Sequence, residues 1–154
     1  MHWRHANGSL SLDGPRILGI VNVTPDSFSD GGQLRTVDAA IARAETLVHE
    51  GADILDVGGE STRPRAESVD AEEELRRVIP FMQELSRRFP EVPLSIDTVK
   101  SRVAREAIEA GAHIVNDVSA FRLDPEMAGT CSKLQVGVVL MAPHAVVQSR
   151  CCCR

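Results

Sequence analysis

Residues 19–32 of this chain read Gly19-Ile20-Val21-Asn22-Val23-Thr24-Pro25-Asp26-Ser27-Phe28-Ser29-Asp30-Gly31-Gly32. The apolar residues from Ile17 to Val21 predict a strand, and the sequence turns polar at Asn22. Pro25 cannot donate a hydrogen bond to a β-ladder, and the closing glycines allow a turn before a helix. A buried strand that leads into such a polar loop is typical of a substrate site at the carboxyl edge of a parallel sheet. For this loop alone, an ordinary strand-to-helix connection is the alternative.

Strands and helices alternate along the rest of the chain. The strands are apolar on both faces, as strands of a buried parallel sheet are, and the alternation predicts a parallel α/β fold. Turn signals within residues 1–16 predict a hairpin that covers the amino-terminal end of a barrel. Periodicity places the further strands at 53–57, 92–96, 113–115 and 136–141, and the helices around 37–48, 70–85, 98–110 and 124–133.

Capping residues mark several helix boundaries. Asp70, with Glu73 three residues later, predicts the start of the second helix, and Thr98 is the expected cap of the third. Gly51 and Gly111 stand where the first and third helices should end. Each glycine is followed by a small residue, a short apolar strand and then an aspartate or asparagine, which is a weak internal repeat.

Polar residues stand at the ends of four predicted strands, at Asn22, Asp56, Asp97 and Asn116. Any one of them alone is more typical of a turn. Four at the same point of each unit converge on one edge of a parallel sheet, because the carboxyl ends of parallel strands share that edge. The pattern therefore indicates a functional site there.

Composition narrows the class of protein. The 154 residues are 43% hydrophobic and 25% charged with a net charge of −5, and no basic stripe points to nucleic acid. No apolar run approaches the roughly 20 residues of a membrane span. Cys131 is the single cysteine of residues 1–150, so no disulfide framework is expected. We predict a cytoplasmic protein that binds neither nucleic acid nor membranes.

Four stretches resemble the dihydropteroate synthases of folate biosynthesis. Residues 20–32 resemble the first signature of that family, and residues 56–64, Asp56-Val57-Gly58-Gly59-Glu60-Ser61-Thr62-Arg63-Pro64, resemble the second. Ser95-Ile96-Asp97-Thr98 and Asn116-Asp117-Val118-Ser119 are similar to its third and fourth strand ends. The resemblance extends over residues 16–141.

The resemblance implies a (β/α)8 TIM-type barrel. It also implies condensation of 6-hydroxymethyl-7,8-dihydropterin pyrophosphate with p-aminobenzoate, which yields 7,8-dihydropteroate and pyrophosphate, and inhibition by sulfonamides, which mimic p-aminobenzoate. A pterin-binding methyltransferase domain on a related barrel fits less well, because it has no need of the long loops at 26–32 and 60–64.

The resemblance assigns roles to the polar residues. Asp97, Asn116 and Asp56 would bind substrate, the first two at the pterin edge, where a carboxylate and an amide match its donors and acceptors. Helix capping by Asp97 and a turn at Asn116 are the alternatives. Asn22 would ligate Mg²⁺, which takes few protein ligands and completes its shell with water and phosphate.

The two long loops would carry the remaining groups. Arg63 suits pyrophosphate or p-aminobenzoate, and the sequence leaves both open, with a solvated loop cation as the alternative. Phe28 would pack on the p-aminobenzoate ring or anchor its own loop to the barrel rim. The expected catalytic residues are Asp26, Ser27, Asp30 and Arg63, and the expected substrate-binding residues of these loops are Thr62, Phe28 and Pro64.

The chain departs from the family after Met141. A full barrel needs about 250 residues, and this chain offers about five of the eight βα units, without the Asp, Lys and Arg-x-His that the family carries on later strands. We therefore expect an incomplete barrel over residues 1–141 and a tail, 142–154, from a shifted or mispredicted reading frame. A truncated, inactive fragment with at most weak pterin binding is the alternative to an active synthase, and the full-length family implies a homodimer. We expect the side chains that face the barrel interior to include Ile17, Val21, Ile54, Ile96, Val115 and Val139.

Overall fold

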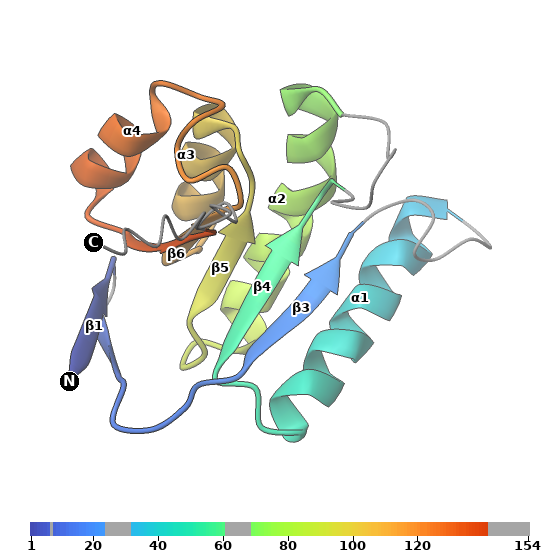
Figure 1. Ribbon diagram of the computed structural model, residues 1–154. Helices are drawn as coiled ribbons and strands as arrows, with labels where there is room; N and C mark the ends of the chain where they lie inside the picture. The colour runs from blue at the N-terminus through green and yellow to red at the C-terminus, as the bar shows by residue number, and fades with distance from the viewer. Residues whose placement is uncertain (7, 24–31, 61–68, 142–154) are drawn as a thin grey trace, which may run out of the picture.

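The computed structural model describes residues 1–6, 8–23, 32–60 and 69–141 of the chain (Figure 1). Its centre is a parallel five-stranded sheet in which the strands lie in sequence order, β3-β4-β5-β6-β7. The strands are β3 (Leu18–Asn22), β4 (Ile54–Gly58), β5 (Leu94–Asp97), β6 (Ile114–Asp117) and β7 (Gly137–Leu140). The predicted parallel α/β fold is confirmed.

A helix follows each of the first four strands of the sheet. These are α1 (Gly32–His49), α2 (Ala71–Arg88), α3 (Ser101–Glu109) and α4 (Met127–Leu134). Helix α1 contacts β3 and β4, and α2 contacts β4, β5 and α3, so neighbouring units pack in sequence order, as in the wall of a barrel. Among the helices of the described ranges, none combines the length and apolar character that a membrane span needs.

The core lies between the sheet and the helices. It joins alternate strand residues to the apolar helix stripes, and its fully buried strand members are Val21, Leu55, Val57, Leu94, Ile96 and Val115. Three of these, Val21, Ile96 and Val115, were expected to face the barrel interior, and that expectation is wrong. Successive side chains of a strand point to opposite faces, so neighbours of Asn22, Asp97 and Asn116 must face the helices.

The first residues form the predicted hairpin, β1 (His2–His5) paired antiparallel with β2 (Gly8–Ser11). It packs on β7, and a Cβ at Gly137 would lie 3.1 Å from His5 Cβ and 3.3 Å from Trp3 Cζ2. Gly137 is the first residue of β7. The hairpin therefore covers the amino-terminal end of the sheet, opposite the polar strand ends, and it needs a residue without a side chain there.

The helix starts agree with the sequence in one case and differ in the other. Asp70 accepts a hydrogen bond from the Glu73 N–H at 2.8 Å, as predicted for the cap of α2. In α3, however, the Ser101 N–H donates to Asp124 Oδ2 at 2.7 Å, while Thr98 Oγ1 accepts from the Lys100 N–H at 3.2 Å. The cap of α3 is thus supplied by the segment that precedes α4.

Candidate functional site

Strand register brings the predicted polar ends together. Asn22 pairs with Gly58, Gly58 with Asp97, and Asp97 with Asn116, so these residues form one row across the carboxyl ends of β3 to β6. Paired residues of a sheet point to the same face. A Cβ at Gly58 would lie 3.0 Å from Asn22 Oδ1 and 3.8 Å from Asp97 Oδ2. The glycine therefore leaves open the space between the asparagine and the aspartate.

Asp56 does not stand in this row. Strand β4 continues to Gly58, two residues beyond Asp56, and Asp56 pairs with Ser95 one level deeper in the sheet. Its side chain is 2% exposed, and its Oδ2 accepts a hydrogen bond from Asn116 Nδ2 at 3.0 Å. The four predicted residues are thus brought into one cluster, with Asp56 beneath the others.

Burial makes Asp56 an unusual carboxylate. Loss of solvent raises its pKa above the usual range, and the nearby Ser95 hydroxyl and the Asn116 amide partly offset that rise. The Ser95 hydroxyl lies near Asp56 but makes no hydrogen bond to it. Asp56 Oδ1 and Ser95 Oγ are both buried without a hydrogen-bond partner among the described residues. Buried polar atoms of this kind ordinarily find partners, so the cluster holds spare bonding capacity.

Asp97 is the titratable residue of the row, and its pKa is raised. Burial, followed by the charges of Asp56, Glu74, Asp117 and Glu60, raises its pKa to about 7. Within the described residues, no hydrogen bond occupies its carboxyl group, and the start of α3 takes its caps from other side chains. A carboxyl that titrates near neutrality and is not used by the fold is a candidate for ligand binding.

The sequence pattern did not identify Lys100, which lies beside the row. Lys100 Nζ lies 2.6 Å from both Glu60 Oε2 and Glu74 Oε2, and the Glu74 side chain is 1% exposed. Burial lowers the pKa of Lys100, but the two carboxylates outweigh burial, so the pKa is raised. The partners lie 40 and 26 residues away in sequence, so no local motif announces the network.

A second group also fastens the end of β4. Arg77 Nη1 donates to the Gly59 carbonyl oxygen at 3.0 Å, and a Cβ at Gly59 would lie 2.6 Å from Val78 Cγ1. The backbone of Gly59 therefore lies against α2. Together with the Lys100 network, this contact positions the exit of β4 beside the row.

The turn after β6 is built around a buried aspartate. Asp117 Oδ1 accepts from the Ser119 N–H at 2.7 Å and Oδ2 from the Phe121 N–H at 3.2 Å. Ala120 and Phe121 both adopt left-handed backbone conformations, with φ of 54° and 63°. L-residues adopt this region at a cost, so Asp117 holds a strained turn directly behind Asn116.

Seven predicted site residues lie outside the described residues. They belong to the two long loops, and they are Asp26, Ser27, Phe28, Asp30, Thr62, Arg63 and Pro64. The tail at 142–154 lies outside as well. The roles expected for these residues stay predictions.

Asn22 suits a metal bound mainly by water and substrate. It is exposed at the end of β3, and its Oδ1 points toward the open space over Gly58. The described ranges hold no group of three or more His, Cys, Asp or Glu side chains arranged for a metal ion. A single amide oxygen fits Mg²⁺, which keeps several waters and binds substrate phosphates.

Comparison with known proteins gives a consistent result. The sequence matches the pterin binding enzyme family over residues 18–150. The dihydropteroate synthase of Clostridium beijerinckii is 49% identical over 125 residues, 81% of this chain and 46% of that protein. The solved Xanthomonas albilineans dihydropteroate synthase with 4-aminobenzoic acid has a TM-score of 0.84 at 53% identity, over 93% of this chain and 53% of that one. The Yersinia pestis enzyme with a sulfonamide drug complex has a TM-score of 0.80 at 43% identity, over 91% and 50%.

The chain spans about half the length of these relatives. Its five parallel strands, with helices after the first four, correspond to an incomplete TIM-type barrel, as the sequence predicted. Both the family match and the structural similarity cover most of the chain. The chain therefore belongs to the pterin binding enzyme family.

Proposed function

We propose that this chain carries part of the site of a dihydropteroate synthase. The reaction joins 6-hydroxymethyl-7,8-dihydropterin pyrophosphate to p-aminobenzoate: the bond from the pterin methylene carbon to pyrophosphate breaks, and a carbon–nitrogen bond to the aniline forms as the nitrogen loses a proton. The observation that carries the proposal is the row of Asn22, Asp97 and Asn116 at the carboxyl ends of three parallel strands. Membership of the pterin binding enzyme family supports it.

Asp97 and Asn116 bind the pterin edge in this proposal. When ionised, Asp97 accepts hydrogen bonds from the amino group and ring N–H groups of the pterin, and Asn116 supplies a further amide contact. The pKa of Asp97, raised to about 7 chiefly by burial, makes ionisation near neutral pH sensitive to a bound donor. A ligand N–H group replaces the solvation that burial removed.

Asn22 and the two loops act on the pyrophosphate and p-aminobenzoate. Asn22 would hold Mg²⁺, whose charge stabilises a leaving pyrophosphate. Thr62 and Arg63 bind anionic groups, Asp26, Ser27 and Asp30 set the first loop beside the pyrophosphate, and Phe28 and Pro64 pack on the p-aminobenzoate ring and exclude water. The similar Xanthomonas synthase was solved with 4-aminobenzoic acid and the Yersinia enzyme with a sulfonamide, which supports both as ligands.

A half-barrel that binds pterin weakly without catalysis is the second candidate. It is favoured by the side of β3 that faces away from the helices, where Ile20 is 58% exposed on the same face as Asn22. In a closed barrel this face packs against further strands. The proposal also includes a homodimer and a cytoplasmic location. The free, buried thiol of Cys131 is compatible with the reducing conditions of the cytoplasm.

The test is formation of 7,8-dihydropteroate, with Mg²⁺ and both substrates, by this chain completed with the remaining barrel strands of a longer relative, compared with its Asp97→Ala, Asn116→Ala and Asn22→Ala variants. Turnover that Asp97→Ala or Asn116→Ala abolishes supports the synthase, and turnover that needs more Mg²⁺ in Asn22→Ala supports the metal assignment. Pterin binding without turnover by residues 1–154 alone supports the half-barrel. Absence of binding, or turnover indifferent to all three substitutions, contradicts the proposed site.

A further inference from the structure

The hydrogen bond between Asp56 and Asn116 crosses the strand that separates them. The two residues stand on β4 and β6, while β5 lies between, with Ser95 paired to Asp56 and Asp97 paired to Asn116. The bond from Asn116 Nδ2 to Asp56 Oδ2, 3.0 Å long, therefore passes over β5 on the face of the sheet that points away from the helices. The small Ser95 side chain leaves room for it.

We infer that Asp56 is a positioning residue, which acts through the Asn116 amide and determines which atom of that amide faces the ligand. The inference rests on the proposed function for the identity of the ligand, but the contact itself does not. It replaces the sequence-based expectation that Asp56 binds substrate directly.

The chemistry of the two groups leaves one arrangement. An ionised carboxylate only accepts hydrogen bonds, whereas an amide has one donor end and one acceptor end. Asp56 therefore binds the NH₂ end of Asn116 and leaves Oδ1 free for the row. Asp97 is the paired neighbour of Asn116 and its side chain points to the same face of the sheet, so Oδ1 and the Asp97 carboxylate are both available on that face. Two adjacent acceptors select a ligand edge with two donors, such as the 2-amino group and ring N–H of a pterin.

A flipped amide would reverse this selection. The NH₂ group would face the ligand's own donors, and Oδ1 would face the Asp56 carboxylate. Both contacts are repulsive in a buried setting, where an unmade hydrogen bond is costly. Since the other carboxylate oxygen, Oδ1 of Asp56, has no partner among the described residues, the bond to Asn116 is the main contact that holds this buried group.

The first experiment measures binding of 6-hydroxymethylpterin through its fluorescence, at low protein concentration, to the 154-residue chain and its variants. Asp56→Asn keeps an acceptor oxygen and should stay within about threefold of wild type, while Asp56→Leu should weaken binding about tenfold. In the Asn116→Ala background, Asp56→Leu should add less than about twofold. Full, additive loss in that background would mean that Asp56 touches the ligand itself and would overturn the inference.

The preference for one ligand over a close analogue is a second measurement, because a variant that is merely destabilised should bind both ligands more weakly and keep the preference. The wild type should prefer the pterin over the analogue with a 2-oxo in place of the 2-amino group, and Asp56→Leu should lose most of that preference. Ser95→Ala is the matched control, because it alters the same level of the sheet and keeps the Asp56–Asn116 bond. Unchanged selectivity in Asp56→Leu contradicts the inference.

A ligand-free measurement separates this inference from the proposed function. In a double-mutant cycle of Asp56→Leu and Asn116→Ala, followed by urea unfolding, the two changes should couple by about fivefold or more in the unfolding equilibrium constant. Asp56→Ala replaces Asp56→Leu if the leucine variant does not fold. Additive effects overturn the inference. If the wild type binds no pterin, the proposed function fails, and the cycle still decides the contact.

Discussion

In the proposed site, Asp97 is the residue at which stability and ligand binding oppose each other. Its carboxyl lies in a partly buried site near four other carboxylates, which raises its pKa to about 7. In the folded chain its charge is therefore costly, and no described residue neutralises it directly. A carboxyl of this kind is a candidate for binding a ligand that brings hydrogen-bond donors.

Asp97→Asn should make the chain less sensitive to pH. The folded-state pKa, about 7, lies above the unfolded value of about 3.9. The folded chain thus binds more protons than the unfolded chain between these values, and stability falls as pH rises through the window. From about pH 5 to pH 8, wild type should lose roughly 2.5 kcal/mol more than Asp97→Asn, because the loss is about 1.4 kcal/mol per pH unit up to the folded-state pKa. Urea unfolding at the two pH values tests this, and equal losses would contradict it.

Ala120 offers a second residue-scale prediction. Its φ of 54° is costly for an L-residue but not for glycine. Ala120→Gly should therefore stabilise the chain by roughly 0.5–1 kcal/mol, because relief of the left-handed strain exceeds the added freedom of the unfolded glycine. Thermal unfolding measures the gain. Phe121→Gly is the control and should destabilise, since Phe121 packs against the core; a lower melting temperature for Ala120→Gly would refute the strain.

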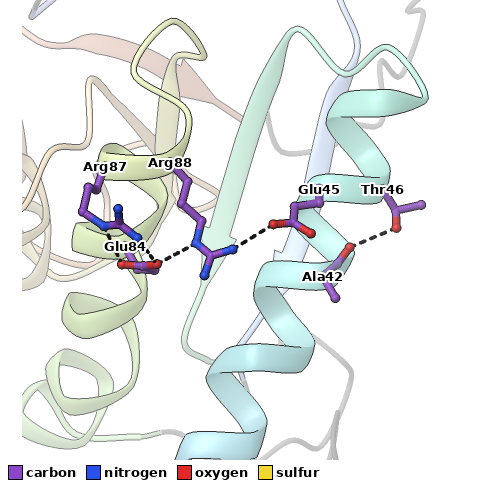
Figure 2. A network of polar contacts seen from close by, with 6 residues as sticks. All are labelled: Ala42, Glu45, Thr46, Glu84, Arg87 and Arg88. Atoms are coloured by element: carbon purple, nitrogen blue, oxygen red, sulfur yellow. Dashed lines mark hydrogen bonds and ion pairs between the residues drawn. The ribbon is translucent and has the colours of Figure 1, made fainter.

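Helices α1 and α2 are joined by an exposed ion-pair network. Figure 2 shows Arg88 between Glu84 of its own helix and Glu45 of α1. Arg88 Nε lies 2.6 Å from Glu84 Oε1, and Arg88 Nη1 lies 2.8 Å from Glu45 Oε1. Hydrogen bonds from Arg87 and then Arg88 lower the pKa of Glu84 to about 2. These groups are in contact with water, and exposed pairs of this kind contribute little to stability. The packing of α1 on α2 therefore depends on the apolar core more than on this network.

At the scale of the elements, caps should count for more than surface pairs. Asp70→Ala and Asp124→Ala should each cost about 1 kcal/mol, because each removes the acceptor of an N–H group at a helix start. Arg88→Ala should cost less than about 0.5 kcal/mol. Chemical denaturation of the three variants compares them directly. An Arg88→Ala variant as unstable as Asp124→Ala would show that the surface network matters more than its exposure indicates.

At the scale of the whole molecule, the two unpaired edges of the sheet favour association between chains. Strands β3 and β7 are the two edges of the five-stranded sheet, and unpaired edges invite association with other strands. Exposed apolar residues lie at or next to both edges, and they are Ile17, Ile20, Leu140 and Met141. The closed barrel of the longer relatives would cover such edges.

Residues 1–154 expressed alone should associate in a concentration-dependent way and form no 7,8-dihydropteroate. The open edges provide the contacts, and five strands provide only part of a barrel wall around the substrates. Ile20→Lys should shift elution from a sizing column toward the monomer, because it places a charge on the exposed edge strand. Arg105→Lys is the control: Arg105 is exposed and already charged, so this substitution should leave the elution unchanged. A monomeric wild-type chain that turns over substrate would contradict both expectations.

Sequence reasoning reached most of the fold, because its signals are local. Alternation of apolar strands and amphipathic helices, the Asp70 cap and the polar residues at the ends of four strands all depend on neighbours within a few positions. The prediction that Val21, Ile96 and Val115 face the barrel interior was wrong. Each precedes a polar residue of the row, so strict alternation along the strand would have placed it on the helix side. The roles predicted for the long-loop residues, from Asp26 to Asp30 and from Thr62 to Pro64, remain predictions.

The sequence by itself determined the order of the elements, the parallel sheet and the edge at which Asn22, Asp97 and Asn116 meet, because these follow from period, capping and chain direction. Only the tertiary structure decided that Asp56 lies beneath the row and holds the Asn116 amide, that Asp124 caps α3, and that Lys100 joins Glu60 to Glu74. The physical reason is distance along the chain. Each of these contacts joins residues 23 to 60 positions apart, and their energies depend on burial and charge that exist only once the strands have packed.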